Sequence, residues 1–431
     1  MNAIFVTIVV TCCLFVQQSA HAESTSIKTA LTLRAALDNA LKNNQGLAQL
    51  RSEAEALAAL PSQRGALPDP MLSLNALNLP TDTFDLDQEP MTQMQVSLSQ
   101  NFPWPGQRRL QNEAASKDAL AASNRVNEKR LQIAAKVRGT WWHLAYLDRA
   151  IEIVKQNQAL MRDFIEIAQT KYKVGKGLQQ DVLLAQLELS KLLNRQLPLE
   201  SMRDAAEADL NALMDRPQGE SITIDTDTAN LDLSQLPQMG ALLEQALANR
   251  PVLDMERNRV DAAKLRIDVA RKKSYPNITV GAAYGFRDAT DPTGRNLPDM
   301  VSFRLGFSLP IYSSSKQDKE IEQRSSSFFA SKYRYSETLR TVESDVSRYH
   351  AQYNASRDQV ELYGSAIIPQ AQQTVSAMLS GYQVNKVDFL NVINAELALY
   401  NAQISYWEAL SKAKQSLALL AAAVGLENVY E

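Results

Sequence analysis

The sequence predicts a mostly α-helical protein with a smaller membrane β-barrel part, built from two structural repeats. Three observations predict this fold: few helix-breaking residues, a similarity between the two halves of the chain, and four short stretches of alternating apolar and polar residues. Only 15 Gly and 16 Pro occur in 431 residues. Ala, Leu, Gln, Glu, Lys and Arg fill the long stretches between them, and this composition favours helix.

Residues 1–22 have the pattern of a secretory signal peptide. An apolar run from Ala3 to Val16 precedes Ala20-His21-Ala22, which is a small-residue cleavage site. No Lys or Arg precedes the run, so a membrane anchor is the alternative, although about fourteen apolar residues are few for a membrane span. Both cysteines, Cys12 and Cys13, lie in this segment. We therefore expect an exported chain without a disulfide, a thiolate metal site or a lipid anchor.

The charge balance and the apolar runs limit the possible partners. The chain has 45 basic and 48 acidic residues, a net charge of −3, and no basic stripe that would bind nucleic acid. After the signal segment no run of 18 apolar residues remains. If the exported chain enters a membrane, it must do so with strands.

The two halves of the mature sequence match each other in order, with small insertions. The matched pairs are Ala40–Asn44 with Ala246–Arg250, Pro103 with Pro310, His143 with His350, and Tyr172–Lys176 with Tyr382–Lys386. A chance alignment would not keep this order over most of the chain. We therefore expect a first repeat over residues 23–230 and a second over 231–431.

Each repeat contains two stretches with the period of a β-strand. They cover about 70–78 and 91–101 in the first repeat, and about 276–286 and 300–310 in the second. Apolar residues alternate with small or polar ones, which suits a membrane barrel with a wet interior. A half-buried hairpin of a soluble protein shows the same alternation and is the alternative. Long loops at one end of the strand pairs and helices at the other favour the outer-membrane arrangement.

Long helices are predicted after each strand pair, over about 106–215 and 313–423. No Pro occurs between Gly106 and Lys171, so one helix there would be on the order of 100 Å long. Gly175-Lys176-Gly177 predicts a tight turn into a returning helix, and Pro198 and Pro369 predict interruptions. Apolar residues at helical spacing indicate antiparallel coiled-coil hairpins.

Four strands per chain cannot close a membrane barrel, because the smallest such barrels have eight strands. Two chains would supply eight strands and three would supply twelve, and only the larger barrel leaves an open pore. Both remain possible from the strands alone.

The chain resembles the TolC-type outer-membrane efflux proteins over essentially its whole mature length. The shared marks are Pro68–Met71, Gln100–Gly106, Tyr172–Gly175 with Asp181-Val182, and Tyr382–Val384 with Asp388–Leu390. The resemblance implies a homotrimer in outer-membrane lipid, with a twelve-stranded barrel continued by an α-helical tunnel through the periplasm. It also implies a periplasmic adaptor protein and an inner-membrane pump of the RND type.

Some segments look most like the heavy-metal branch of that family. They are Pro68–Met71, Phe102–Gly106 and Ile368–Ala371. We therefore expect a passive exit duct for metal cations. Export of drugs, peptides or proteins is the alternative within the same class, and a periplasmic coiled-coil scaffold is the alternative from another class.

The resemblance also assigns roles to residues at the helical tips. Adaptor docking falls on Val174, Gly175, Lys176, Val384, Asn385 and Lys386, and the periplasmic gate falls on Asp181, Tyr382, Asn391 and Asn394. The basic residue that assists the family's closed state falls on Val387, so the lock is either weaker or uses Lys386. Asn391 and Asn394 replace an acidic pair, which predicts a less electronegative throat. The simpler reading of Asp181 is stabilisation of a helix N-terminus.

No pattern of catalysis or cofactor binding is present. The mature sequence lacks His-Glu-x-x-His, a P-loop and a Gly-x-Gly-x-x-Gly after a strand. His143 and His350 occupy equivalent helical positions, where packed or solvated histidines are expected. Met91, Met94 and Met300 near the strands are soft enough to bind copper, but we interpret them as adaptable apolar surface. We expect no enzyme activity, no cofactor and no resident metal.

Overall fold

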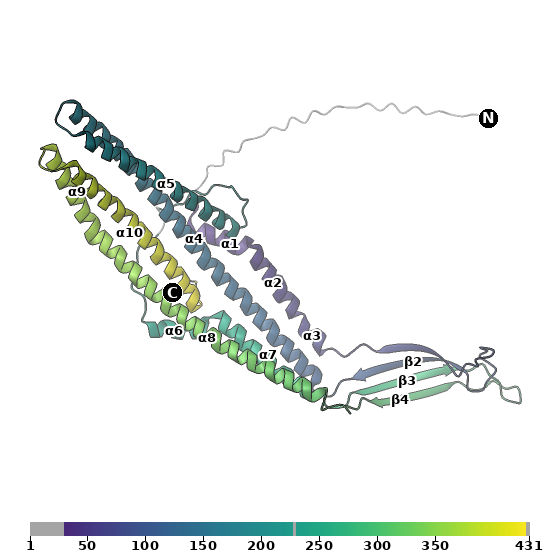
Figure 1. Ribbon diagram of the computed structural model, residues 1–431. Coiled ribbons are helices and arrows are strands. Elements are labelled where there is room, and N and C mark those ends of the chain that lie inside the picture. Colours follow the sequence, from purple (N-terminus) through teal and green to yellow (C-terminus); the bar gives the residue numbers. More distant parts are fainter. Residues whose placement is uncertain (1–29, 227–229, 428–431) are drawn as a thin grey trace, which may run out of the picture.

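The computed structural model describes residues 30–226 and 230–427, and the expected signal peptide lies outside these ranges. The molecule is elongated, with a long helical bundle and a narrow sheet that continues from one of its ends (Figure 1). The two pairs of helical tips lie at the opposite end of the bundle. The predicted mostly α-helical fold with two repeats is confirmed.

The four strands form one antiparallel sheet in the order β1-β2-β3-β4. They are β1 (Met71–Leu77), β2 (Gln93–Phe102), β3 (Ile278–Phe286) and β4 (Met300–Phe307). The central pair, β2 and β3, joins the repeats, with Leu98 opposite Ala282. The outer strands β1 and β4 each pair on one side only, so both edges of the sheet are open.

The register gives the sheet one apolar face. Directly opposed residues share a face, and one face carries Leu72, Leu74, Ala76, Met94, Val96, Leu98, Phe102, Ile278, Val280, Ala282, Tyr284, Phe286, Val301, Phe303, Leu305 and Phe307. Gln100 is the polar exception, and its side chain donates to the Pro68 carbonyl. Leu74 is 74% exposed and Phe303 is 86% exposed. The other face is mostly Ser, Gln, Asn, Thr, Gly and Ala.

The helices follow a similar order along the chain in both repeats. The first repeat contains α1 (Leu33–Asn43), α2 (Gln45–Ala58), α3 (Leu60–Gly65), α4 (Gln107–Lys173) and α5 (Gln179–Leu213). The second contains α6 (Met239–Asn249), α7 (Pro251–Lys272), α8 (Gln317–Leu362), η1 (Tyr363–Ile367), α9 (Ile368–Gln383) and α10 (Phe389–Val424). Helix α4 has 67 residues, and its counterpart runs through consecutive stretches of 46, 5 and 16 residues. The helix that runs from the sheet to the tip therefore has the same number of residues in both repeats.

The predictions for the two prolines have different outcomes. The expected break at Pro198 is wrong, because Pro198 lies inside the continuous 35-residue helix α5. The next residue, Leu199, is buried in the main core, and packing of this kind offsets the one backbone hydrogen bond that proline removes. At Pro369 the helix continues as well, through the π-helical turn η1 directly before α9. A π turn is a common way to absorb a lost hydrogen bond.

The core lies where the two hairpins meet around α4. Trp141, Leu144 and Leu147 of α4 are fully buried in one cluster with residues of α1, α5 and α10. The Trp141 indole also donates to the Leu31 carbonyl at 3.1 Å. A second cluster joins α6, α8 and the end of α10. Within the described ranges, none of the helices has the length and apolarity needed to span a bilayer.

Candidate functional site: the helical tips and the linker between the repeats

The two helical tips have the same backbone geometry. Gly175 and Asn385 occupy equivalent positions with φ of 72° and 60°, the left-handed conformation that favours Gly and Asn after a helix. The amide of Lys176 donates to the Lys171 carbonyl at 2.9 Å, and the amide of Lys386 donates to the Gly381 carbonyl at 2.9 Å. Each tip is therefore a tight, hydrogen-bonded turn with a defined shape.

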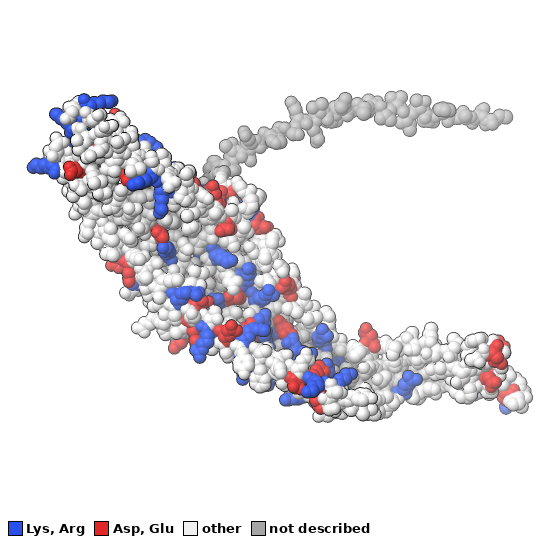
Figure 2. Space-filling view, in the orientation of Figure 1, with Lys and Arg blue, Asp and Glu red and all other residues white. Residues whose placement is uncertain are grey.

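The outermost residues of both tips face solvent. Val174 and Val384 are each 62% exposed, and Gly175, Lys176, Asn385 and Lys386 are exposed as well. Basic side chains gather at this end of the molecule (Figure 2). Each tip thus presents an apolar side chain next to a positive charge.

A glycine and a larger side chain exchange places between the two tips. In the first tip, a Cβ on Gly177 would lie 2.8 Å from Cβ of Lys171. In the second tip the glycine is Gly381, where a Cβ would lie 2.5 Å from Cγ2 of Val387. Lys171 and Gly381 are equivalent positions, as are Gly177 and Val387. Val387 therefore fills the space beside the backbone of its own tip.

Lys171 links the first hairpin to the second. Its Nζ donates to the Tyr382 carbonyl at 3.0 Å and to Oδ1 of Asn385 at 3.1 Å. The same Nζ lies 3.8 Å from the centroid of the Tyr382 ring, which is the geometry of a cation–π contact. The basic residue at this junction is therefore Lys171, which sequence reasoning missed when it considered Lys386. The sequence feature that could have indicated Lys171 is that a lysine precedes the repeated tyrosine in the first tip only.

Tyr382 is held among aromatic residues from both hairpins. Its ring lies 5.2 Å from that of Phe389, which lies 5.9 Å from Phe164 of α4. Tyr382 is 8% exposed, and its hydroxyl has no hydrogen-bond partner within the described residues. Burial raises the pKa of Tyr382, and the nearby Asp181 carboxylate raises it further. The structure thus brings Asp181 near Tyr382 without a direct hydrogen bond.

Asp181 lies in the first turn of α5. Burial raises its pKa, and Asp388 of the other tip raises it further, while a backbone hydrogen bond and Lys171 act in the opposite direction. The two remaining gate candidates, Asn391 and Asn394, are exposed in the first turns of α10. Because they are three positions apart, they lie on the same helix face. That face carries amides in place of charges.

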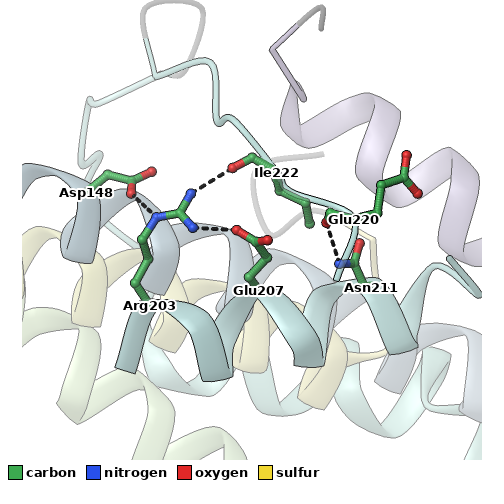
Figure 3. Close-up of polar contacts among 6 residues, drawn as sticks. All are labelled: Asp148, Arg203, Glu207, Asn211, Glu220 and Ile222. Atoms are coloured by element: carbon green, nitrogen blue, oxygen red, sulfur yellow. Dashed lines mark hydrogen bonds and ion pairs between the residues drawn. The ribbon is translucent and has the colours of Figure 1, made fainter. Parts of the chain in front are cut away.

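The linker between the repeats, residues 214–238, is tied to both hairpins. Figure 3 shows Arg203 of α5 between Asp148 of α4, Glu207 and the Ile222 carbonyl, to which it donates at 2.7 Å. Asn211 donates to the Glu220 carbonyl at 2.8 Å. Arg149 of α4 donates to the Thr226 hydroxyl at 3.2 Å. Both helices of the first hairpin therefore hold the first part of the linker.

Two donors from the second hairpin hold the later part of the linker. Nζ of Lys414, on α10, donates to the Asp232 carbonyl at 2.7 Å, and the Tyr353 hydroxyl, on α8, donates to the Ser234 carbonyl at 2.7 Å. Burial lowers the pKa of Lys414 to about 8, although Asp232 partly opposes this shift. The linker is thus fastened to four different helices through side-chain contacts.

The candidate metal-binding side chains lie apart. His143 is half-buried, which lowers its pKa, and its ring is 6.0 Å from that of Tyr146. His350 contacts Asn354 of its own helix. Met94 shares a row with Phe286, whereas Met300 lies opposite Gly285, so these methionines project from opposite faces of the sheet. In the described part of the chain, no three His, Cys, Asp or Glu residues are grouped to hold a metal ion.

The comparison with known families finds the same duplication. A family model described as outer membrane efflux protein matches residues 36–216 and again residues 242–426. The two matches begin within α1 and α6 and end shortly after α5 and α10. They therefore coincide with the two repeats of the structure.

Individual relatives have low identity but long coverage. The chain is 22% identical over 391 residues to the cobalt-zinc-cadmium resistance protein CzcC of Cupriavidus metallidurans, which covers 90% of this chain and 88% of that protein. It is 22% identical over 296 residues to the outer membrane protein TolC of Vibrio cholerae, or 67% of each chain. The solved outer membrane protein VceC of Vibrio cholerae has the same fold, with a TM-score of 0.75 at 18% identity over 91% of this chain and 96% of that one.

Proposed function

The chain belongs to the outer membrane efflux protein family, and from this premise we propose that it is the exit duct of a heavy-metal cation efflux system. As a family member it is an outer-membrane efflux channel with its helical part in the periplasm, and it is not an enzyme. The proposal concerns its assembly, its partners and its cargo.

The observation that carries the proposed assembly is the exposed apolar face of an open-edged sheet. In lipid, the unpaired backbone groups of β1 and β4 would cost several kcal/mol each. Pairing β4 of one chain with β1 of the next removes both edges. Three chains give a twelve-stranded barrel with a pore, and the helices then form a periplasmic tunnel in line with it. The alternative, a periplasmic scaffold, would leave the apolar face in water.

The assembly is tested by fractionation. We expect the processed protein in the outer membrane, extracted by detergent as a trimer that resists mild heating. A monomer in the periplasmic fraction would overturn the channel assembly.

The proposed partners are a periplasmic adaptor at the tips and an RND-type pump in the inner membrane. The exposed Val174 and Val384, each beside an exposed lysine, suit an adaptor with an apolar groove and acidic rim. The gate would lie just beyond the tips, at Asp181, Tyr382, Asn391 and Asn394, with Lys171 as the basic residue that joins the hairpins. Replacement of both valines by Asp should abolish co-purification of the adaptor while leaving the trimer intact.

The proposed cargo is supported by the share of the chain that aligns with each relative. The resemblance to a cobalt-zinc-cadmium resistance protein extends over 90% of the chain, whereas that to TolC extends over 67%. A deletion strain should become sensitive to cobalt, zinc or cadmium and regain resistance with the cloned gene. Sensitivity to drugs alone would favour the alternative, a drug export channel.

A further inference from the structure

The face of the sheet opposite the apolar face carries a single charged residue. Arg304, near the middle of β4, is the only charged residue in the four described strands. The strand region is largely uncharged, and acidic side chains gather at its far end (Figure 2). A lone charge in an otherwise neutral stretch of pore determines the local electrostatic potential.

The register places Arg304 on the face opposite the apolar one. Arg304 pairs with Gly281, and Gly281 pairs with Ser99. Its neighbours along β4, Phe303 and Leu305, belong to the apolar face. This placement is also the favourable one, because an arginine that faces lipid at the bilayer midplane destabilises a membrane barrel. In the proposed barrel, Arg304 therefore projects into the water-filled interior.

Nothing in the described residues neutralises or covers this guanidinium. Arg304 is exposed, its cross-strand partner Gly281 has no side chain, and its same-face neighbours on β4 are Ser302 and Gly306. No strand supplies a carboxylate, and this includes β1, which would lie next to β4 in a closed barrel. In the loop just before β4, Asp299 already accepts hydrogen bonds from the Tyr284 hydroxyl and the Arg287 amide. The charge remains available to ions in the pore.

We propose that Arg304 sets the charge selectivity of the strand pore, where one copy from each subunit forms a positive ring that favours anions over cations. This inference rests on the proposed trimeric barrel. It gives the duct a selectivity opposite to the charge of its proposed cargo. Metal cations then leave by the force of the pump and together with anions, and the pore itself does not select them.

The test is the reversal potential of the purified trimer in planar lipid bilayers under a KCl gradient. A ring potential of about one kT changes the partition of a monovalent ion by about threefold, in opposite directions for cations and anions. Because the two changes multiply in the ratio, Arg304→Gln should raise the potassium-to-chloride permeability ratio about sevenfold, and Arg304→Glu should raise it further. Arg304→Lys should retain the wild-type ratio. The effect should shrink in concentrated salt, because the Debye length falls from about 10 Å at 0.1 M to about 3 Å at 1 M.

The matched control is Arg295→Gln, which removes the same charge from the β3–β4 loop, where Arg295 is 82% exposed. It should shift the ratio much less. A second test introduces a single cysteine for chemical modification. Both natural cysteines lie in the predicted signal segment, so the mature chain is expected to contain no other thiol. Modification of Arg304→Cys by a cationic thiol reagent should restore the wild-type ratio, and an anionic reagent should move it the other way.

The outcomes separate the two proposals. Channels of normal conductance with unchanged selectivity in Arg304→Gln, Arg304→Glu and modified Arg304→Cys would overturn the Arg304 ring and leave the channel intact. Failure of the wild-type protein to form channels would overturn the proposed barrel, and the ring with it.

Discussion

Nζ of Lys171 in the first hairpin lies 3.8 Å from the ring centroid of Tyr382 in the second and donates to the Tyr382 carbonyl at 3.0 Å. These contacts join the two tips of one chain at the level of the proposed gate. They are made to the face of the ring and to the backbone. The hydroxyl of Tyr382 takes no part in them.

Replacement of Lys171 by Met should weaken the closed state. The change removes two hydrogen bonds and a cation–π contact, together about 1–2 kcal/mol at a partly exposed site, which corresponds to a five- to thirtyfold shift toward open tips. Single-channel recordings of the trimer in bilayers would show a larger open fraction.

Two matched variants serve as controls. One tests the loss of a lysine charge alone, and the other tests the loss of the Tyr382 hydroxyl alone. Lys173→Met removes an exposed lysine from the same tip and should leave the recordings unchanged. Tyr382→Phe retains the ring and the carbonyl, so it should open the channel less than Lys171→Met does. If Tyr382→Phe has the larger effect, the tyrosine hydroxyl, and not Lys171, holds the gate.

The second tip should be sensitive to a methyl group at Gly381. A Cβ there would lie 2.5 Å from Cγ2 of Val387, and overpacking of this kind costs about 1–3 kcal/mol. Gly381→Ala should therefore speed proteolytic cleavage at the second tip, and the added substitution Val387→Gly should reverse the effect. Gly240→Ala is the control, because its new Cβ would meet nothing within 4 Å. Equal cleavage rates in Gly381→Ala and Gly240→Ala would show that the second tip tolerates the extra volume.

Much of this architecture could be predicted from the sequence, because it depends on local patterns. The absence of Pro between Gly106 and Lys171 predicts the long helix, and the alternation around Val280 and Phe303 predicts the strands and their faces. The contacts between repeats could not be predicted. Whether a lysine meets Tyr382 depends on the distance between two hairpins, and whether Pro198 breaks a helix depends on what packs beside it.

The residues that hold the linker are also invisible in the sequence. Arg203, Lys414 and Tyr353 donate to carbonyls of a segment with no repeated pattern. Any long polar side chain at those positions would look the same in the sequence. Only the path of the linker over the helices identifies the partners.

Lys414 should make stability depend on pH in the alkaline range. Its pKa falls from the usual 10.5 to about 8 through burial. Between about pH 8 and pH 10.5 the unfolded chain holds a proton that the folded chain has released, so the free energy of unfolding rises with pH in this window. Below pH 8 both states are protonated, and the folded state bears the full cost of the buried charge, about 3 kcal/mol as an upper estimate.

Lys414→Met should therefore raise the Tm at pH 7 and match the wild type above about pH 10.5. Thermal unfolding followed by circular dichroism across this range would measure the difference. Lys412→Met is the control, because Lys412 is 60% exposed and pairs with Glu408 on the same helix. A lower Tm for Lys414→Met at pH 7 would mean that its hydrogen bond to the Asp232 carbonyl outweighs the cost of burying the charge.

Among the residues that attach the linker, Arg203 should be the one whose replacement destabilises the protein most. Its side chain is 23% exposed, and its guanidinium pairs with Asp148 across the hairpin and with Glu207, whose side chain is only 13% exposed. Arg203→Met leaves both carboxylates and the Ile222 carbonyl without this donor, and such a loss in a partly buried network costs about 2–4 kcal/mol. We expect a lower Tm and faster proteolytic cleavage within residues 214–238.

The comparison that isolates this network is Arg257→Met, which removes an exposed arginine from an ion pair with Asp254 of the same helix. Exposed pairs contribute about 0–1 kcal/mol, so Arg257→Met should keep the wild-type Tm and cleavage rate. Adding Asp148→Asn to Arg203→Met should recover part of the lost stability, because it removes one unpaired carboxylate. If Arg203→Met and Arg257→Met unfold and are cleaved alike, the linker is held by its other contacts, and the two hairpins do not depend on Arg203 for their attachment.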